Sequence, residues 1–446
     1  MTLTLATASA QDGSAPLPVE TRAGRNAKRT LIGIWVVLMV LLLRHREVIS
    51  SDTLSNYIHV WFVSDQFWHG GGLPYRMPVL AHGQALAFPY GFIPWMFAVM
   101  LWPLMGEWSV TLTLGVGFVA MVLATFWAFP ELRRGWWAAA VLVNPAFVEG
   151  LLLGQLPFLW ASAMLLFAIG CWRRDRRRLA IVLAALAQIT HAPILIPLIA
   201  VLVIGWARYE PDRRALIRAW VISLVPALPA VYLVFASPVT SQTSPLWSVW
   251  VEVETLALRS LVLIVPLGLL YLQSRERRPN APIIAAAVMV VGQFVTIPIS
   301  GMVSGWGALN RDPDRAASAI THSVSIVHGA TYRVLSYGDG KYGMYAVVRA
   351  GGRLDSEFFP ESLYRRSFRD ESAYATFLTK RKVEYVLVDH RYKKFHTNEQ
   401  ALLDAIAATP GDAGCVGGLR VQRELQTATL TTYRITRGCS APVATN

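Results

Sequence analysis

The sequence predicts an all-α polytopic membrane protein that carries a small carboxyl-terminal α/β domain outside the cytoplasm. Of its 446 residues, 54% are hydrophobic and only 15% are charged, whereas about a quarter of a typical soluble chain is charged. Arginine clusters at residues 173–178 and 275–278 separate apolar runs, as in loops that remain in the cytoplasm. After residue 300 the sequence becomes more charged and is patterned like a small mixed domain.

The same composition excludes several other classes of protein. Abundant apolar residues and only three cysteines exclude a disordered, collagen-like or disulfide-dense chain. A net charge of +13 would favour nucleic-acid binding in a soluble domain. Here the basic residues lie mostly between apolar runs, so we expect no nucleic-acid partner.

Residues 1–30 are expected to form a disordered cytoplasmic tail. They are polar, rich in small residues and basic toward their end. No apolar stretch of about 7 to 15 residues is present there, so the segment does not have the pattern of a signal peptide.

Residues 31–300 are expected to form the transmembrane domain. A helix needs about 20 residues to cross a bilayer, so the apolar runs predict about nine to eleven transmembrane helices, some of them short, broken or tilted. The runs begin near Leu31, Pro89, Ser109, Trp136, Gln155, Leu179, Ala192, Leu216, Thr255 and Ala281. The basic loops place the amino end in the cytoplasm and everything after Ser300 outside it. The topology of residues 88–172 stays open, because one run there is re-entrant or two runs join.

Residues 301–446 predict a small extracytoplasmic α/β domain. Strands are expected at 332–337, 344–348, 383–388, 419–425 and 429–435, and helices at 371–382 and 398–408. The last two strands resemble a hairpin that turns at Thr427. Cys415 and Cys439 are equally far from that turn, so we expect a disulfide at the open end of the hairpin, with two unpaired thiols as the alternative.

The segment 50–88 is expected to be a long first external loop that begins with a helix. Ser51 can cap this helix, and the helical spacing places Asp52, Ser55 or Asn56, and His59 on one polar face. Another face is apolar and suits the membrane surface, with Leu54, Ile58 and Trp61 on it. Polar groups would thereby gather at the boundary between water and membrane.

Phe88-Pro89-Tyr90 at the start of the second apolar run, Asp52 after the first, and Asn144-Pro145 with Gly154-Gln155 further on resemble elements of the GT-C superfamily of membrane glycosyltransferases. The likeness covers roughly residues 30–300 and is closest to the members that use polyprenyl-phosphate mannose. Many members carry paired acidic residues in the first loop, whereas Asp52 is followed by Thr53. No cofactor is therefore expected; a divalent cation stays open as an alternative, although no ligand motif supports one.

The resemblance implies an inverting hexosyl- or pentosyltransferase of the plasma or inner membrane. It would move a sugar from a polyprenyl-phosphate carrier to a hydroxyl of a glycan, glycolipid or protein acceptor at the extracytoplasmic face. Asp52 would be the general base that takes the acceptor proton. The expected substrate contacts are His59, Arg76, Gln155, His191 and Asp65, of which Asp65 is also the rival base.

Two other functions stay open. The chain could be a transporter or flippase for lipid-linked saccharides, although transporters often contain internal repeats and no convincing repeat is found here. It could also be a noncatalytic assembly factor for the cell envelope. That function would make Asp52 dispensable and residues 301–446 essential.

Overall fold

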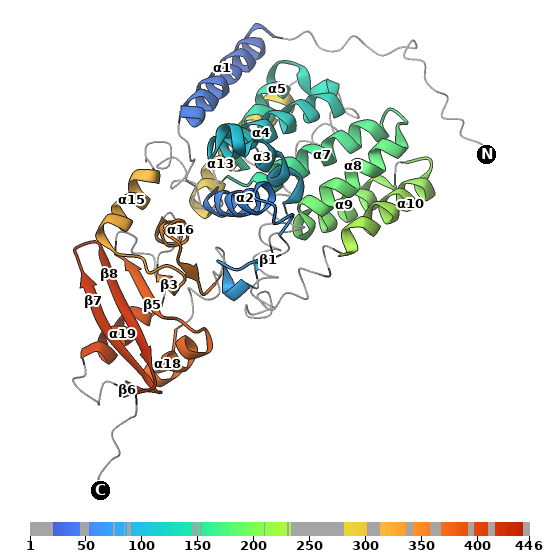
Figure 1. The fold of residues 1–446 in the computed structure, drawn as a ribbon. Coiled ribbons are helices and arrows are strands. Elements are labelled where there is room, and N and C mark those ends of the chain that lie inside the picture. Colours follow the sequence, from blue (N-terminus) through green and yellow to red (C-terminus); the bar gives the residue numbers. More distant parts are fainter. Residues whose placement is uncertain are drawn as a thin grey trace, which may run out of the picture.

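The computed structural model describes residues 21–44, 53–74, 76–83, 85–86, 91–144, 147, 150–151, 154–208, 210–229, 232, 281–300, 313–335, 342–356, 367–390, 397–408 and 415–439. Figure 1 shows a body of packed helices beside a smaller domain that contains a sheet. The helices of the body are α1 (Arg22–Arg44), α2 (Thr53–Trp68), α3 (Phe92–Met105), α4 (Trp108–Ala128), α5 (Gly135–Leu142), α7 (Leu156–Trp172), α8 (Arg177–Thr190), α9 (Ala192–Trp206), α10 (Arg213–Leu224) and α13 (Ala281–Ser300).

Short elements connect these helices. They are the 3₁₀ turns η1 (Ala81–Gly83), η2 (Pro130–Arg133) and η3 (Val225–Ala227), and the strands β1 (Arg76–Met77) and β2 (Ala85–Leu86), which form an antiparallel hairpin. Helix α7 lies at the centre of the body, where it packs against both α4 and α8. α1 packs on α5, and α2 packs on α3.

The predicted polytopic membrane fold is wrong. Within the described ranges, α4 alone is long and apolar enough to cross a bilayer, and 56% of its most apolar window is buried inside the protein. Four other apolar helical stretches of the described residues have 10 to 17 residues, fewer than the roughly 20 that a crossing requires: Phe92–Met105, Leu156–Trp172, Leu195–Trp206 and Pro282–Val291. The structure therefore shows no set of nine to eleven spans; the run expected near Thr255 lies outside the described residues.

Breaks between the helices divide the apolar runs, and the apolar side chains are buried where the helices pack on one another. The chain leaves helical geometry at Gly106, after α3, and at His191, which separates α8 from α9 as the sequence predicts. Small residues allow close helix contacts: a Cβ atom on Gly117 would lie 2.6 Å from the Trp160 ring, and one on Gly170 would lie 2.5 Å from Trp127. High apolar content here supports a protein core, which hydropathy cannot distinguish from a lipid environment.

Two local expectations in the body are also wrong. Residues 22–30, expected in a disordered tail, form the first turns of α1, where Gly24 packs on Trp136 and Lys28 donates to the Arg133 carbonyl at 3.1 Å. The apolar face of α2 does not lie on a membrane, because Leu54 and Ile58 are fully buried in the protein core.

The carboxyl-terminal domain contains a mixed six-stranded sheet in the order β4-β3-β5-β8-β7-β6. Its elements are α15 (Pro313–Ser323), β3 (Thr331–Leu335), α16 (Tyr342–Arg349), β4 (Arg353–Leu354), α18 (Glu371–Lys380), β5 (Tyr385–Asp389), α19 (Glu399–Ala408), β6 (Cys415–Val416), β7 (Leu419–Gln426) and β8 (Leu430–Arg437). β3 is parallel to both β4 and β5, and the remaining pairs are antiparallel.

Most of the elements expected in this domain are confirmed. The strand at residues 344–348 is wrong, because these residues belong to α16. Residues 342–348 of that helix are all buried, and a helix that is apolar on every side lacks the periodicity that would separate it from a buried strand. The expected disulfide is confirmed: Cys415 and Cys439 are bonded, and the hairpin turns at Thr427.

The two parts of the molecule share one continuous core. α16 contacts both α2 and the sheet, and Leu80, beside the β1-β2 hairpin, forms a bridge with Leu354 of β4. The Leu354 amide donates to the Val79 carbonyl at 2.9 Å. Arg349 of α16 pairs with Glu107, between α3 and α4, at 3.0 Å. The α/β domain is therefore docked against the helical body by backbone, apolar and charged contacts.

Candidate functional site

The amino-terminal ends of α3, α7 and α9 meet inside the helical body. Their N-cap residues are Gly91, Gln155 and His191. The Gly91 amide donates to the carbonyl of Thr190 at 3.1 Å, which places the start of α3 beside the start of α9. The ring of Phe158, in the first turn of α7, lies edge-on to His191 with 6.2 Å between the centroids.

The local sequence explains why the helices begin at these points. Gly91 has a left-handed backbone (φ 68°), which glycine adopts without strain. Pro157 and Pro193 stand in the first turns of α7 and α9, where proline is well tolerated. Neither Gln155 nor His191 caps its own helix with its side chain, and Gly91 has none. The positive dipole ends of three helices therefore lie near one another, beside the carboxyl end of α8 at Thr190, and a helix amino end favours a negatively charged group.

Helix α2 contributes a polar face to the same region. Asn56 donates from Nδ2 to the Gly154 carbonyl at 2.9 Å, and its Oδ1 accepts from Trp95 Nε1 at 2.9 Å. The His59 ring stacks on the Trp95 ring, with 4.3 Å between the centroids. His59 Nδ1 lies 2.7 Å from the Ser55 carbonyl, so in the neutral ring Nδ1 carries the proton and Nε2 is the acceptor.

These contacts link α2 to α3, α3 to the start of α9, α9 to α7, and the start of α7 back to α2. We call its residues the helix-start cluster: Asn56, His59, Gly91, Trp95, Gln155, Phe158 and His191. Gln155 is 8% exposed, and its Oε1 has no hydrogen-bond partner among the described residues. A buried acceptor without a donor costs about 1–3 kcal/mol, so a ligand that supplies a donor would gain from binding at this position.

The structure brings together three of the site residues that the sequence predicted. His59, Gln155 and His191 all belong to the helix-start cluster. Arg76 lies instead in β1, paired with Leu86, in the hairpin beside the carboxyl-terminal domain. Asp65 is exposed near the end of α2, where it pairs with His69 at 3.2 Å.

The proposed base, Asp52, lies outside the described residues. In the sequence it immediately precedes Thr53, the first residue of α2, the helix that carries Asn56 and His59.

Sequence reasoning missed Trp95 and Phe158, because each stands in an apolar run. Trp95 has a local signal nevertheless: it follows Gly91 by one helical turn, and a Cβ atom on Gly91 would lie 2.8 Å from the indole ring. The signal for Phe158 is only its place one turn after Gln155, and its partner His191 is 33 positions away in the sequence.

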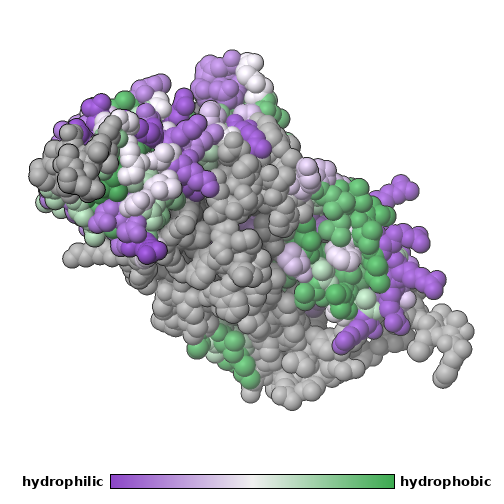
Figure 2. Space-filling view, turned by 90° about the horizontal axis from the view of Figure 1, so that it is seen from below, coloured by the Kyte–Doolittle hydropathy of each residue, from purple (hydrophilic) through white to green (hydrophobic). Residues whose placement is uncertain are grey.

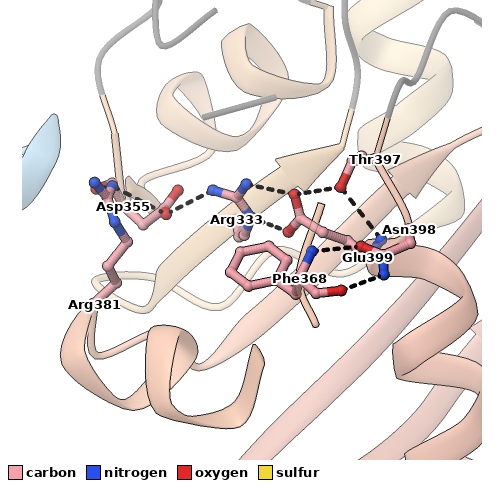
Figure 3. A network of polar contacts seen from close by, with 7 residues as sticks. All are labelled: Arg333, Asp355, Phe368, Arg381, Thr397, Asn398 and Glu399. Carbon is pink, nitrogen blue, oxygen red and sulfur yellow. Dashed lines mark hydrogen bonds and ion pairs between the residues drawn. The ribbon is translucent and has the colours of Figure 1, made fainter. Parts of the chain in front are cut away.

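A second polar cluster lies in the carboxyl-terminal domain (Figure 3). Arg333 of β3 is fully buried and binds both carboxylate oxygens of Glu399, at 2.5 and 2.7 Å, and Asp355 at 3.1 Å. Burial opposes the charge of Arg333, but the two carboxylates outweigh it and raise the pKa of the guanidinium. Arg381 also contacts Asp355. These partners satisfy one another, so the cluster has the character of a structural network.

No group of three or more histidine, cysteine or acidic side chains is arranged to hold a metal ion within the described part of the chain. No known protein family matches the chain, and no curated protein or solved structure is significantly similar to it.

Proposed function

We propose that the chain is a glycosyltransferase that works at the cell membrane. It would transfer a hexose or pentose from a polyprenyl-phosphate carrier to a hydroxyl of a glycan, glycolipid or protein acceptor, with inversion at the sugar carbon. The observation that carries this proposal is the helix-start cluster, in which three helix amino ends meet two imidazoles and a buried carboxamide. That combination suits a phosphate-linked sugar.

The helix-start cluster would act on the leaving group. When the bond between the sugar carbon and the phosphate oxygen breaks, negative charge accumulates on the lipid phosphate. Helix amino ends stabilise such charge, and fixed dipoles in a buried site do so without reorganisation. In its protonated form His59 would also donate to the phosphate from Nε2, and His191 would donate from a protonated ring nitrogen. Gln155 Oε1 would accept a hydrogen bond from a sugar hydroxyl.

The acceptor would be activated by Asp52. Its carboxylate takes the proton of the acceptor hydroxyl while the hydroxyl oxygen attacks the sugar carbon from the side opposite the phosphate. The new glycosidic bond forms as the phosphate leaves with the electron pair of the broken bond. Inversion follows from this single displacement.

The proposal is tested by transfer of radiolabelled sugar in membranes that contain the full chain. The donors are polyprenyl-phosphate mannose and its glucose, galactose and arabinose analogues. Asp52→Asn should abolish transfer, because the amide cannot take the proton. Trp95→Phe should reduce transfer by about tenfold or more, because it removes the hydrogen bond to Asn56 and shifts the His59 stack.

Trp35→Phe is the matched control. Trp35 is also buried and its Nε1 donates to a carbonyl, that of Leu142, at 2.8 Å, but it lies outside the helix-start cluster. Equal transfer by Asp52→Asn and wild type at equal protein level would refute the catalytic role of Asp52. If no donor supports transfer, the result favours the two alternative functions, which are transport of lipid-linked saccharides and a role in envelope assembly.

A further inference from the structure

A deep apolar groove lies between α7, α8, α9 and α10, away from the helix-start cluster. It begins near Leu165 and ends at Trp172, the last residue of α7. Because a helix rises about 1.5 Å per residue, Leu165, where the groove begins on α7, is about 15 Å along the helix from Gln155, and Trp172 is about 25 Å from it. The groove therefore lies beyond the candidate site along α7.

The lining of the groove suits a hydrocarbon chain. Its lining is almost entirely apolar, and Ser223 is the one hydroxyl among its lining residues. That hydroxyl donates to the Trp220 carbonyl at 2.7 Å and accepts from Gln188 at 2.8 Å. A water molecule needs two to four polar partners, so most of the groove favours an apolar occupant.

The mouth of the groove is strongly basic. Residues 173–178 and 208–218 contain nine arginines and three acidic residues. Arg177 lies over the Trp172 ring, 5.4 Å from its centroid, and pairs with Asp175 and Asp212. Arg176 and Arg178, its neighbours in the sequence, are exposed and line a second hollow with it. Basic side chains therefore lie beside the Trp172 end of the apolar groove.

The surface beside the groove is likewise apolar with a hydrophilic edge. Figure 2 shows an apolar area over α9 and α10, on the right of the view, with hydrophilic side chains along its edge. Exposed apolar residues of the two helices include Val201, Ile204, Ile217 and Val221. An apolar surface bordered by arginines matches the layers of an anionic membrane, in which hydrocarbon lies below phosphate.

We propose that this groove binds one hydrocarbon chain of an anionic membrane phospholipid, with the lipid phosphate held by Arg176 and Arg178. The charge of the mouth selects the headgroup, and the apolar lining accepts the chain. The site is distinct from the helix-start cluster and does not depend on the proposed sugar transfer. The bound lipid would anchor helices α7 to α10 in a membrane leaflet that contains anionic phospholipid.

The test uses the full chain in detergent micelles and phosphatidylglycerol with brominated acyl chains, which quench tryptophan fluorescence on contact. Trp172, Trp206 and Trp220 line the groove, so binding should quench part of the emission. Brominated phosphatidylcholine, with the same chains and no net charge, is the headgroup control. We expect at least fivefold tighter apparent binding of phosphatidylglycerol.

Two kinds of variant separate chain binding from headgroup binding. Replacing both Arg176 and Arg178 by Gln should weaken phosphatidylglycerol binding by about fivefold for each arginine and leave phosphatidylcholine unchanged. The matched control replaces Arg353 and Arg369, two exposed arginines of the carboxyl-terminal domain, by Gln. This variant should leave the binding of both lipids unchanged. Ala184→Phe fills the groove from α8 and should remove the groove quenching for both lipids.

Ala219→Leu narrows the same groove from α10 and provides a second test if Ala184→Phe fails to fold by near-ultraviolet circular dichroism. Equal quenching of the wild type by the two lipids would overturn the headgroup assignment. Undiminished quenching in a folded groove-filling variant would show that the lipid binds elsewhere. Either result rejects the proposal without bearing on sugar transfer, which is measured at the other end of α7.

Discussion

Replacement of Arg333 by Met should strongly destabilise the carboxyl-terminal domain. Arg333 is 0% exposed and neutralises two buried carboxylates, Glu399 and Asp355, through three hydrogen bonds. Methionine has a similar length but no charge, so both carboxylates lose this partner. Removal of one member of a buried ion pair costs about 3–5 kcal/mol. That loss is a large share of the roughly 5–15 kcal/mol by which a protein is stable.

The structure also predicts how the loss divides between the two carboxylates. Asp355 keeps Arg381, whose Nη1 lies 3.5 Å from its Oδ2. Besides Arg333, the Glu399 carboxylate accepts a hydrogen bond from the Thr397 hydroxyl at 3.2 Å. That hydroxyl is a neutral donor. Most of the loss should therefore come from Glu399. The double variant Arg333→Met with Glu399→Met should recover a substantial part of the stability, because neither buried charge of that pair remains.

The assay is urea unfolding of the full chain in detergent, followed by pulse proteolysis, which reports cleavage within the carboxyl-terminal domain. Arg434→Met is the control, because Arg434 pairs with Glu424 at 3.6 Å while both side chains are well exposed, at 52% and 37%. An exposed pair contributes about 0–1 kcal/mol. A loss below about 1 kcal/mol for Arg333→Met, no larger than for Arg434→Met, would refute the view that Arg333 neutralises an otherwise unpaired buried charge.

Three further predictions follow from local geometry. Gly91→Ala should displace the Trp95 ring and reduce sugar transfer, whereas Gly106→Ala, also at positive φ but with open space around its Cβ, should impose only about 1–3 kcal/mol of backbone strain. Burial lowers the pKa of His82, against the opposing effect of the nearby Asp355 carboxylate. The folded state therefore binds this proton less readily than the unfolded state, and stability present above about pH 6.5 is lost as pH falls through the lowered pKa. Asparagine tolerates the left-handed backbone at this position. His82→Asn should therefore make the unfolding midpoint depend less on pH between pH 5 and 8; an unchanged pH dependence would contradict this. Cys415→Ser should cost about 3 kcal/mol, because the bond closes a loop of 24 positions, and reductant should abolish the difference from wild type in the same unfolding assay.

Part of the candidate site could be predicted from the sequence. His59, Gln155 and His191 are polar residues at the edges of apolar runs, and such placement at membrane depth or in a core requires a reason. Their proximity could not be predicted, because Asn56, Gly91, Gln155 and His191 come from segments far apart in the chain. Only helix packing brings those segments together, through contacts such as Asn56 to Gly154 and Gly91 to Thr190.

The sequence by itself determined the local structure of this protein. The alternating strands of the carboxyl-terminal hairpin, the disulfide at its end and the break at His191 follow from side-chain period, cysteine placement and the proline after the break. The tertiary structure decided what surrounds the apolar residues. Hydropathy measures how strongly a side chain avoids water, but helix neighbours and lipid satisfy that preference equally. Short helices packed around α7, and α16 enclosed on every side, could therefore be distinguished from membrane spans and from a strand only in the folded chain.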